Sequence, residues 1–177
     1  MKKIIVKAKL KNKEEFEKKL SDIEMNFSPI IWQHDRVYAP RGFKRGMNLP
    51  RIMMRTEMKA VDKPARYEMI LKRHIEDSGV DVVDATVVKD YAEAVSILHQ
   101  LGFKKIAEVS RRRQEISMGE GTKMFLDKVE NVAGFYVKLE TEIQETEKVS
   151  SVLEDLKKTL KVLGVDNIVR ETYFELA

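Results

Sequence analysis

The sequence predicts a mostly β fold of the α+β class, in which eight strands form a barrel or a sandwich and three or four helices pack around them. Three observations lead to this prediction. Apolar and charged residues alternate strictly in residues 4–10, which is the pattern of a strand with two different faces. Several later segments repeat that alternation. Glycine-containing and proline-containing turns separate these segments, and helical periodicity is confined to short stretches.

The first predicted strand has two different faces, a pattern that several later strands repeat. One of its faces is apolar and is expected to meet a core, and the other carries two lysines. The apolar face consists of Ile4, Val6, Ala8 and Leu10, and the other of Ile5, Lys7 and Lys9. Asn12 is expected to cap a helix that runs to about Met25.

The next elements follow from the same reasoning. We expect strands over residues 30–38, 51–57, 66–75, 80–88, 104–116, 122–129 and 135–143. Asp90 is expected to begin a helix that runs through Leu101, with Gly102 directly after its end, and Gly119 and Gly121 mark a hairpin turn. Ser150 or Ser151 is expected to cap a further helix that Gly164 ends. Residues 167–176 are expected to form a short final helix.

Composition limits the function classes. The 177 residues are 43% apolar and suffice for one domain, expected to cover residues 1–177. There are 33 Lys and Arg against 29 Asp and Glu, so the net charge of +4 does not indicate a tail that coats nucleic acid. There is no cysteine, and the three histidines lack metal-ligand spacing, which argues against zinc. With no leader and no long apolar run, we expect a cytoplasmic protein without a membrane partner.

Cations recur at alternate positions on strand after strand. They are Lys7, Lys9, Arg51, Arg55, Lys72, Arg111, Arg113 and Lys138. If the sheet closes, these groups converge, and crowded like charges need a counter-anion. A polyphosphate would supply it, because arginine offers bidentate donors and lysine a compact charge. The alternative is that each charged face is a solvated outer surface.

The chain resembles the CYTH superfamily of triphosphate tunnel enzymes, especially the class IV adenylate cyclase (CyaB-like) branch. The resemblance covers nearly the whole chain through the order and spacing of short segments. These are residues 6–10, 33–38, 52–55, 71–72, 98–103, 111–113, 126–129, 134–140 and 173–176. It implies eight antiparallel strands in a closed barrel with flanking helices. It also implies that basic side chains inside hold the triphosphate of ATP or inorganic triphosphate, and that glutamates hold magnesium or manganese.

The resemblance also implies particular site residues. By position, Lys9 matches the lysine of the N-terminal E-x-E-x-K signature, Arg55 the second arginine of an L-R-I-R-like strand, and Lys72 the fourth-strand lysine. Arg111 and Arg113 match the basic pair after the middle helix. Glu140 matches the second glutamate of an E-x-E on the last strand, and is the candidate metal ligand.

The chain departs from that pattern at the metal-ligating positions. Ile5 and Lys7 replace the two N-terminal glutamates, Lys138 replaces the first glutamate of the last strand, and Met53 replaces the first arginine of L-R-I-R. The fifth strand offers no glutamate, and its nearest acid is expected to be Asp84. Divalent cations need carboxylate oxygens. We therefore expect Lys7 and Lys138 to provide positive charge without metal, or to form ion pairs with Glu140 or another acid.

Three functions remain open at this point. The first is a cyclase-related tunnel protein that binds a triphosphate or similar polyanion, with metal-dependent catalysis weakened or lost. The second is an active adenylate cyclase or triphosphatase with a reduced metal site. The third is a nucleic-acid or protein-binding module, which no aromatic-basic surface motif supports. The resemblance adds a homodimer as an expected assembly.

Overall fold

The computed structural model describes residues 2–44, 47, 49–60, 62–75, 80–144 and 148–176, without the side chains at 74, 75 and 80. Eight strands run through this part of the chain. They are β1 (Lys2–Lys9), β2 (Ile31–Pro40), β3 (Arg51–Met58), β4 (Arg66–Ile75), β5 (Val80–Val87), β6 (Phe103–Gly119), β7 (Thr122–Val129) and β8 (Tyr136–Glu142). The helices are α1 (Lys13–Asp22), α2 (Tyr91–Gln100), α3 (Val149–Val162) and α4 (Tyr173–Leu176).

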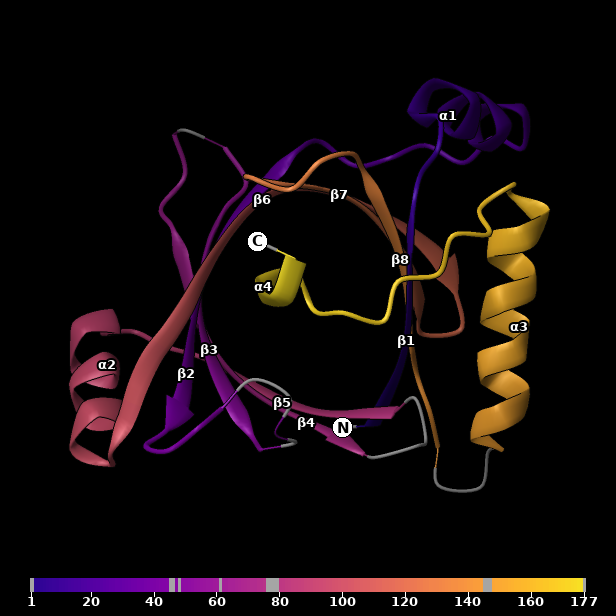
Figure 1. Cartoon of the computed structure of the whole chain (residues 1–177). Helices are drawn as coiled ribbons and strands as arrows, with labels where there is room; N and C mark the ends of the chain where they lie inside the picture. Colours follow the sequence, from indigo (N-terminus) through magenta and orange to yellow (C-terminus); the bar gives the residue numbers. More distant parts are fainter. Residues whose placement is uncertain are drawn as a thin grey trace.

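The strands close into one antiparallel barrel in the order β1-β5-β4-β3-β2-β6-β7-β8 (Figure 1). Closure depends on β1, which pairs with β8 along most of its length and with β5 over a shorter stretch. The contact with β5 joins residues 2–4 of β1 to residues 80–82, and this short pairing completes the ring of strands. The eight-stranded antiparallel barrel with flanking helices is therefore confirmed, and the sandwich alternative is excluded.

The largest apolar core lies outside the barrel wall. Ile4 and Val6 of β1 pack with Leu139 of β8 beneath α1 and α3, which supply Leu20 and Leu160. Each of these five side chains is at most 3% exposed. The apolar face of β1 consequently points outward to the helices, and the face with the lysines points into the barrel.

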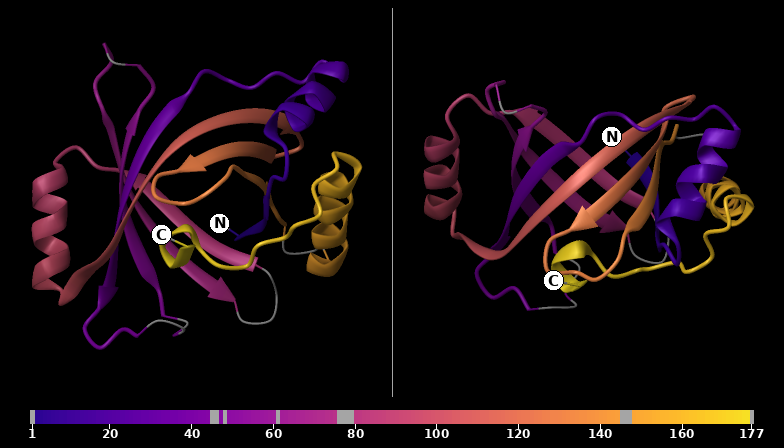
Figure 2. Two further views of the ribbon diagram at one scale, coloured as in Figure 1. Left: turned by 45° about the horizontal axis from the view of Figure 1, so that its top comes forward. Right: turned by 90° about the horizontal axis from the view of Figure 1, so that it is seen from above.

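On the opposite side of the barrel, α2 covers a second apolar cluster (Figure 2). Leu98 of this helix packs with Met54 and Tyr38, all at most 2% exposed. The Asp90 carboxylate accepts a hydrogen bond from the backbone N–H of Glu93 at 2.9 Å and so caps α2, which begins where the sequence predicted. The two helical layers thus brace opposite walls of the barrel.

Helix ends were predicted with mixed success. Asn12 Oδ1 accepts from the Glu15 N–H at 3.1 Å, as expected, but α1 ends at Asp22 and not at Met25. The prediction of Ser150 or Ser151 as the cap of α3 is wrong. This helix starts at Val149, and Lys148 holds the cap position without a side-chain hydrogen bond.

The C-terminal segment returns across the barrel. Ile168 forms an isolated bridge with Ala8, and the Val169 N–H donates to the Lys7 carbonyl at 2.8 Å. Only residues 173–176 are helical, because the preceding residues run extended beside β1. α4 lies over the barrel opening that faces the viewer in Figure 1, and Tyr173 and Phe174 pack there with Val109 and Val129.

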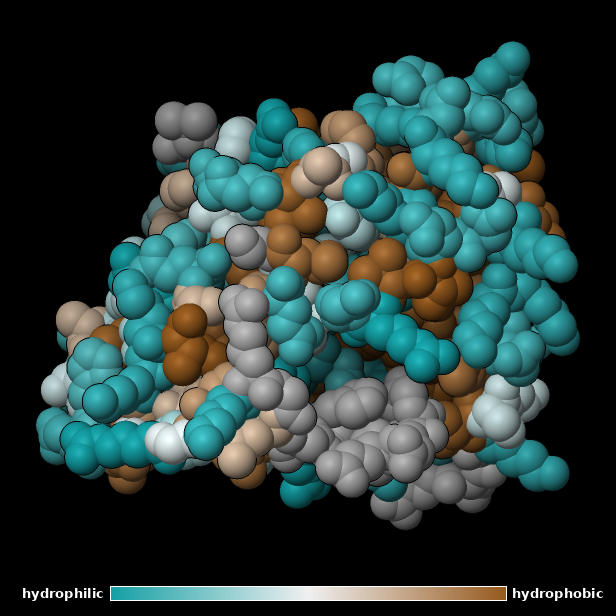
Figure 3. Space-filling view, in the orientation of Figure 1, coloured by the Kyte–Doolittle hydropathy of each residue, from teal (hydrophilic) through white to brown (hydrophobic). Residues whose placement is uncertain are grey.

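The molecular surface on this side is mixed (Figure 3). Hydrophilic residues cover α1, whereas hydrophobic residues reach the surface near the middle of the face, where the C-terminal segment runs. Among the described residues, no helix is long and apolar enough to cross a membrane.

Candidate functional site

All the side chains predicted as ligands lie on inward-facing strand positions. Register brings them together: Lys7 lies opposite Lys138 across β1 and β8, and Arg51 lies opposite Lys72 across β3 and β4. Pairs on one face of adjacent strands are in contact range. The predicted set inside the barrel is Lys7, Lys9, Arg55, Lys72, Arg111, Arg113, Lys138 and Glu140.

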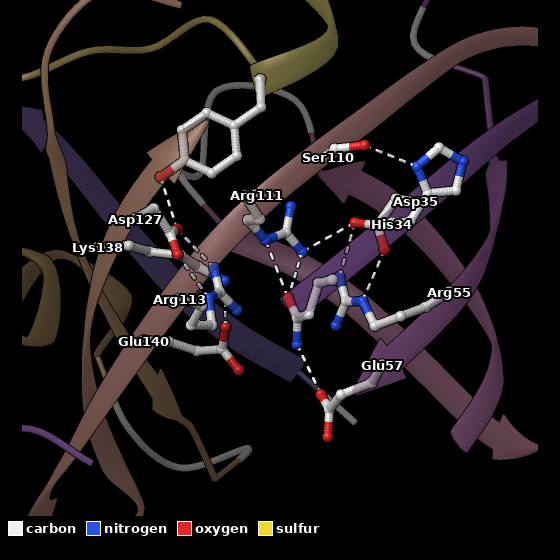
Figure 4. Close-up of polar contacts among 12 residues, drawn as sticks. His34, Asp35, Arg55, Glu57, Ser110, Arg111, Arg113, Asp127, Lys138 and Glu140 are labelled. Atoms are coloured by element: carbon white, nitrogen blue, oxygen red, sulfur yellow. Dashed lines mark hydrogen bonds and ion pairs between the residues drawn. The ribbon is translucent and has the colours of Figure 1, made fainter. Parts of the chain in front are cut away.

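The first charged cluster is centred on Asp35 of β2 (Figure 4). Arg55 donates to both carboxylate oxygens, at 2.7 and 2.9 Å, and Arg111 Nη2 donates to Oδ2 at 2.8 Å. Arg111 also donates twice to Gln33 Oε1, whose amide group donates to Glu57 at 2.7 Å. Burial disfavours the Asp35 carboxylate, but Arg111 and Arg55 outweigh it and hold the pKa of Asp35 below its ordinary range.

The second cluster is centred on Asp127 of β7, which is fully buried. Arg113 donates to both of its oxygens, at 2.7 and 2.6 Å, and the Tyr173 hydroxyl of α4 donates to Oδ2 at 2.8 Å. Burial opposes ionisation, yet the Arg113 guanidinium lowers the pKa of Asp127 to about 2. This pair therefore stays ionised at neutral pH.

The third cluster joins β1 and β8. Glu140 accepts from Lys3 and from Lys138, each at 2.5 Å, so one carboxylate is held between two ammonium groups. Burial raises the pKa of Glu140, but Lys138 and Lys3 reverse this and leave it below the ordinary range. Figure 4 shows Glu140 and Lys138 beside the Arg113 cluster.

The remaining tunnel cations have different partners. Lys72 pairs with Asp81 at 2.7 Å. The Lys7 ammonium donates to the carbonyl of Glu171 and lies 4.4 Å from the centre of the Tyr173 ring. Lys9 passes close to Gly134, where a Cβ would lie 2.9 Å from Lys9 Cε, and the φ of +89° at this loop position favours glycine.

Positive charge remains in excess around these groups. Burial, reinforced by Lys72, lowers the pKa of Lys7 to about 8. The pKa of Lys138 is also about 8, because burial together with Arg113 and Lys72 outweighs the help of Glu140. Burial and the neighbouring arginines likewise lower the pKa of Arg111. Burial is the largest cause of each shift and neighbouring cations add to it, so a nearby anion would favour the charged forms of these groups.

Sequence reasoning missed the acids that neutralise the tunnel. Asp35, Asp81 and Asp127 are at most 6% exposed and face the same lumen as the cations. The expectation for the fifth strand fell on the wrong acid: Asp84 lies opposite Leu71 and is exposed, whereas Asp81 faces inward. The alternation of β2 placed Asp35 on one face with Gln33, which was the available signal.

These carboxylates do not fit a divalent metal. Two arginines hold Asp35, Arg113 and Tyr173 hold Asp127, and two lysines hold Glu140. Within the described part of the chain, no three His, Asp or Glu side chains gather in a way that could hold a metal ion. A hard cation would have to displace buried ammonium or guanidinium groups from each oxygen.

A closed antiparallel barrel with a tunnel lined by paired charges defines the class of this protein. The CYTH domain family model matches residues 1–173, so the chain belongs to the CYTH domain family. No curated protein matches it significantly by sequence.

Solved structures share this fold at low sequence identity. A Pyrococcus horikoshii protein is 21% identical with a TM-score of 0.85, covering 98% of this chain and 97% of its own. A Vibrio parahaemolyticus protein described as a candidate adenylate cyclase is 16% identical, with a TM-score of 0.81 and coverage of 98% and 96%. A Hippeastrum protein, described as a candidate adenylyl cyclase with a dominant triphosphatase activity, is 15% identical, with a TM-score of 0.62 and coverage of 99% and 94%.

Proposed function

We propose that the chain binds a triphosphate or another polyphosphate anion in its tunnel without needing a divalent metal, and that metal-dependent catalysis is weakened or lost. The observation that carries this proposal is the sharing of carboxylates. Asp35 serves two arginines and Glu140 serves two lysines, so each leaves one positive charge in excess. Lys7 adds a further cation, with a carbonyl and an aromatic ring as its partners.

The acids inside the tunnel act as exchangeable counter-ions in this proposal. A triphosphate oxygen can take the place of a carboxylate oxygen on arginine, because both accept two parallel N–H donors. Arg111 suits such an exchange, since Asp35 would still keep its bidentate contact with Arg55. Glu57, which accepts from the Gln33 amide, places negative charge at the edge of the same cluster and limits how far the ligand extends there.

Loss of metal chemistry follows from the same contacts. Coordinated metal would neutralise phosphate and polarise the bond to be broken. Lys7 and Lys138 can supply the charge, but an ammonium group cannot activate water as a coordinated metal does. The pairing of β1 with β8 and the return of residues 167–169 to β1 support the proposal that residues 1–177 form one CYTH-like domain.

A second candidate is metal-dependent turnover, as an adenylate cyclase or a triphosphatase. The description of the Hippeastrum structure supports it, although at 15% identity the likeness itself extends to the fold alone. Release of phosphate or pyrophosphate that requires magnesium or manganese would favour this candidate over the first.

The decisive experiment is calorimetric titration with inorganic triphosphate and with ATP, each with magnesium and with a chelator. We expect binding that survives the chelator. Arg111→Gln removes a charge-assisted contact worth about 1.5–3 kcal/mol, so affinity should fall by about tenfold or more. Arg36→Gln is the matched control, because Arg36 faces outward and contacts Tyr91 and Glu108. Binding that needs magnesium, or equal losses in both variants, would contradict the proposal.

A further inference from the structure

The outer wall of the barrel carries a pocket that borders the tunnel wall at Gln33 and Arg111. It has a volume of about 740 Å³ and lies on β2, β3, β6 and the end of β7, bordered by residues 130–133 between β7 and β8. This volume is typical of sites for small molecules. On this wall His34 Nδ1 and Ser110 Oγ lie 2.8 Å apart, and Figure 4 shows this pair beside the tunnel residues of the same strands.

Strand register arranges the outward side chains of the pocket in two rows. Successive neighbours across four strands form the first row, which changes from apolar to cationic: Met58, Trp32, Arg112 and Lys128. The second row is polar and consists of Thr56, His34 and Ser110. Because residues two apart in a strand share a face, both rows line the same side of the wall.

Trp32 gives the pocket a flat apolar surface. It is the only tryptophan of the chain and is 51% exposed, although it lies in the middle of a sheet. The Arg112 guanidinium lies 5.6 Å from the centre of its ring. An arginine stacked on an indole presents a planar surface that is apolar on one part and cationic on the other.

The charge of Arg112 is available for a ligand. Among the described residues Arg112 has no carboxylate within ion-pair distance, whereas Arg36 on the same outer wall lies 3.4 Å from Glu108. Lys128 is differently occupied: it donates to the carbonyls of Val132 and Gly134, at 3.0 and 3.2 Å. These two bonds fix the loop that borders the pocket, so the site is formed in the absence of a ligand.

We propose that this pocket binds a small planar aromatic molecule that carries one anionic group. The ring lies over Trp32 and His34, with its apolar edge toward Met58, and the anionic group meets Arg112. The carboxylate of Glu130 at the rim disfavours ligands with several negative charges. The chemistry of this ligand therefore differs from that of the polyphosphate proposed for the tunnel.

Because Trp32 is the only tryptophan, its fluorescence reports on this pocket directly. The probes are adenosine monophosphate and benzoate, which represent an aromatic phosphate and an aromatic carboxylate. Adenosine, benzyl alcohol and inorganic phosphate are the matched compounds that lack the charge or the ring. We expect saturable quenching by at least one aromatic anion, about tenfold tighter than by its neutral counterpart.

The variants separate this site from the tunnel and from non-specific binding. Arg112→Gln should weaken the aromatic anion about tenfold and leave triphosphate binding in the calorimeter unchanged. Arg36→Gln should leave both unchanged. The proposal is overturned if no probe alters Trp32 emission, if inorganic phosphate acts as well as the aromatic anions, or if Arg36→Gln has the same effect as Arg112→Gln. Emission that changes with protein concentration alone would assign the pocket to contact with a second copy, and would also overturn it.

Discussion

Replacing Asp127 with asparagine tests whether tunnel acids serve as counter-ions. Asp127→Asn keeps the shape of the side chain but removes its negative charge, and with it the carboxylate whose two oxygens accept hydrogen bonds from Arg113. The Arg113 side chain is only 6% exposed, so its charge would be left buried without an ionised partner. Breaking a buried pair in this way costs about 3–5 kcal/mol. For a chain of this length that is a fall in Tm of about 6–20 °C.

The same variant predicts a gain that a purely structural ion pair would not produce. Without Asp127, Arg113 is free for a phosphate oxygen, so inorganic triphosphate should raise Tm more in Asp127→Asn than in the unmodified chain. Thermal unfolding followed by circular dichroism, with and without triphosphate and in the presence of a chelator, measures both effects.

A control shows whether burial is the cause. Asp166→Asn removes an exposed acid that pairs with Lys11, with side chains 64% and 72% exposed, and should leave Tm essentially unchanged. Our reasoning is refuted if Asp127→Asn unfolds at the same temperature as the unmodified chain. If it is destabilised but gains no extra stabilisation from triphosphate, Arg113 does not reach the ligand.

Two further predictions concern the lysines of the tunnel. The pKa values of Lys7 and Lys138 are about 8, below their ordinary value, so the free protein loses protons above pH 8 that an anion-bound state must take up again. Triphosphate affinity should therefore fall between pH 7 and pH 9, by up to about tenfold per pH unit for each lysine. Lys138→Gln removes one of these lysines and should make the fall of affinity with pH less steep when it is measured by calorimetry. An unchanged slope would contradict this prediction. Combining Lys7→Glu with Lys138→Glu places two carboxylates beside Glu140. The double variant should create manganese binding that calorimetry detects and that the control Lys104→Glu, at an exposed position opposite Ala39, lacks.

Sequence reasoning identified the strands and the charged residues of the tunnel. The alternation of β1, with apolar residues at even positions and lysines at 7 and 9, is enough by itself to define two faces. Pairing of Lys7 with Lys138 and of Arg51 with Lys72 then brings the predicted cations to one side of the sheet. The order and spacing of short segments pointed to the family that the domain match confirms.

Only the tertiary structure decided what these charges contact. The sequence showed that β1 has an apolar face, but not that this face points outward to α1 and α3, because alternation does not say which side a sheet encloses. The partners of Arg111 and Arg113 also lay beyond sequence reasoning. Asp35 is 76 residues from Arg111, and one step of register decides that Asp81, and not Asp84, faces Lys72. Residue types and faces are local properties of a chain, whereas counter-ion pairs depend on barrel closure and on the register of strands that are far apart in sequence.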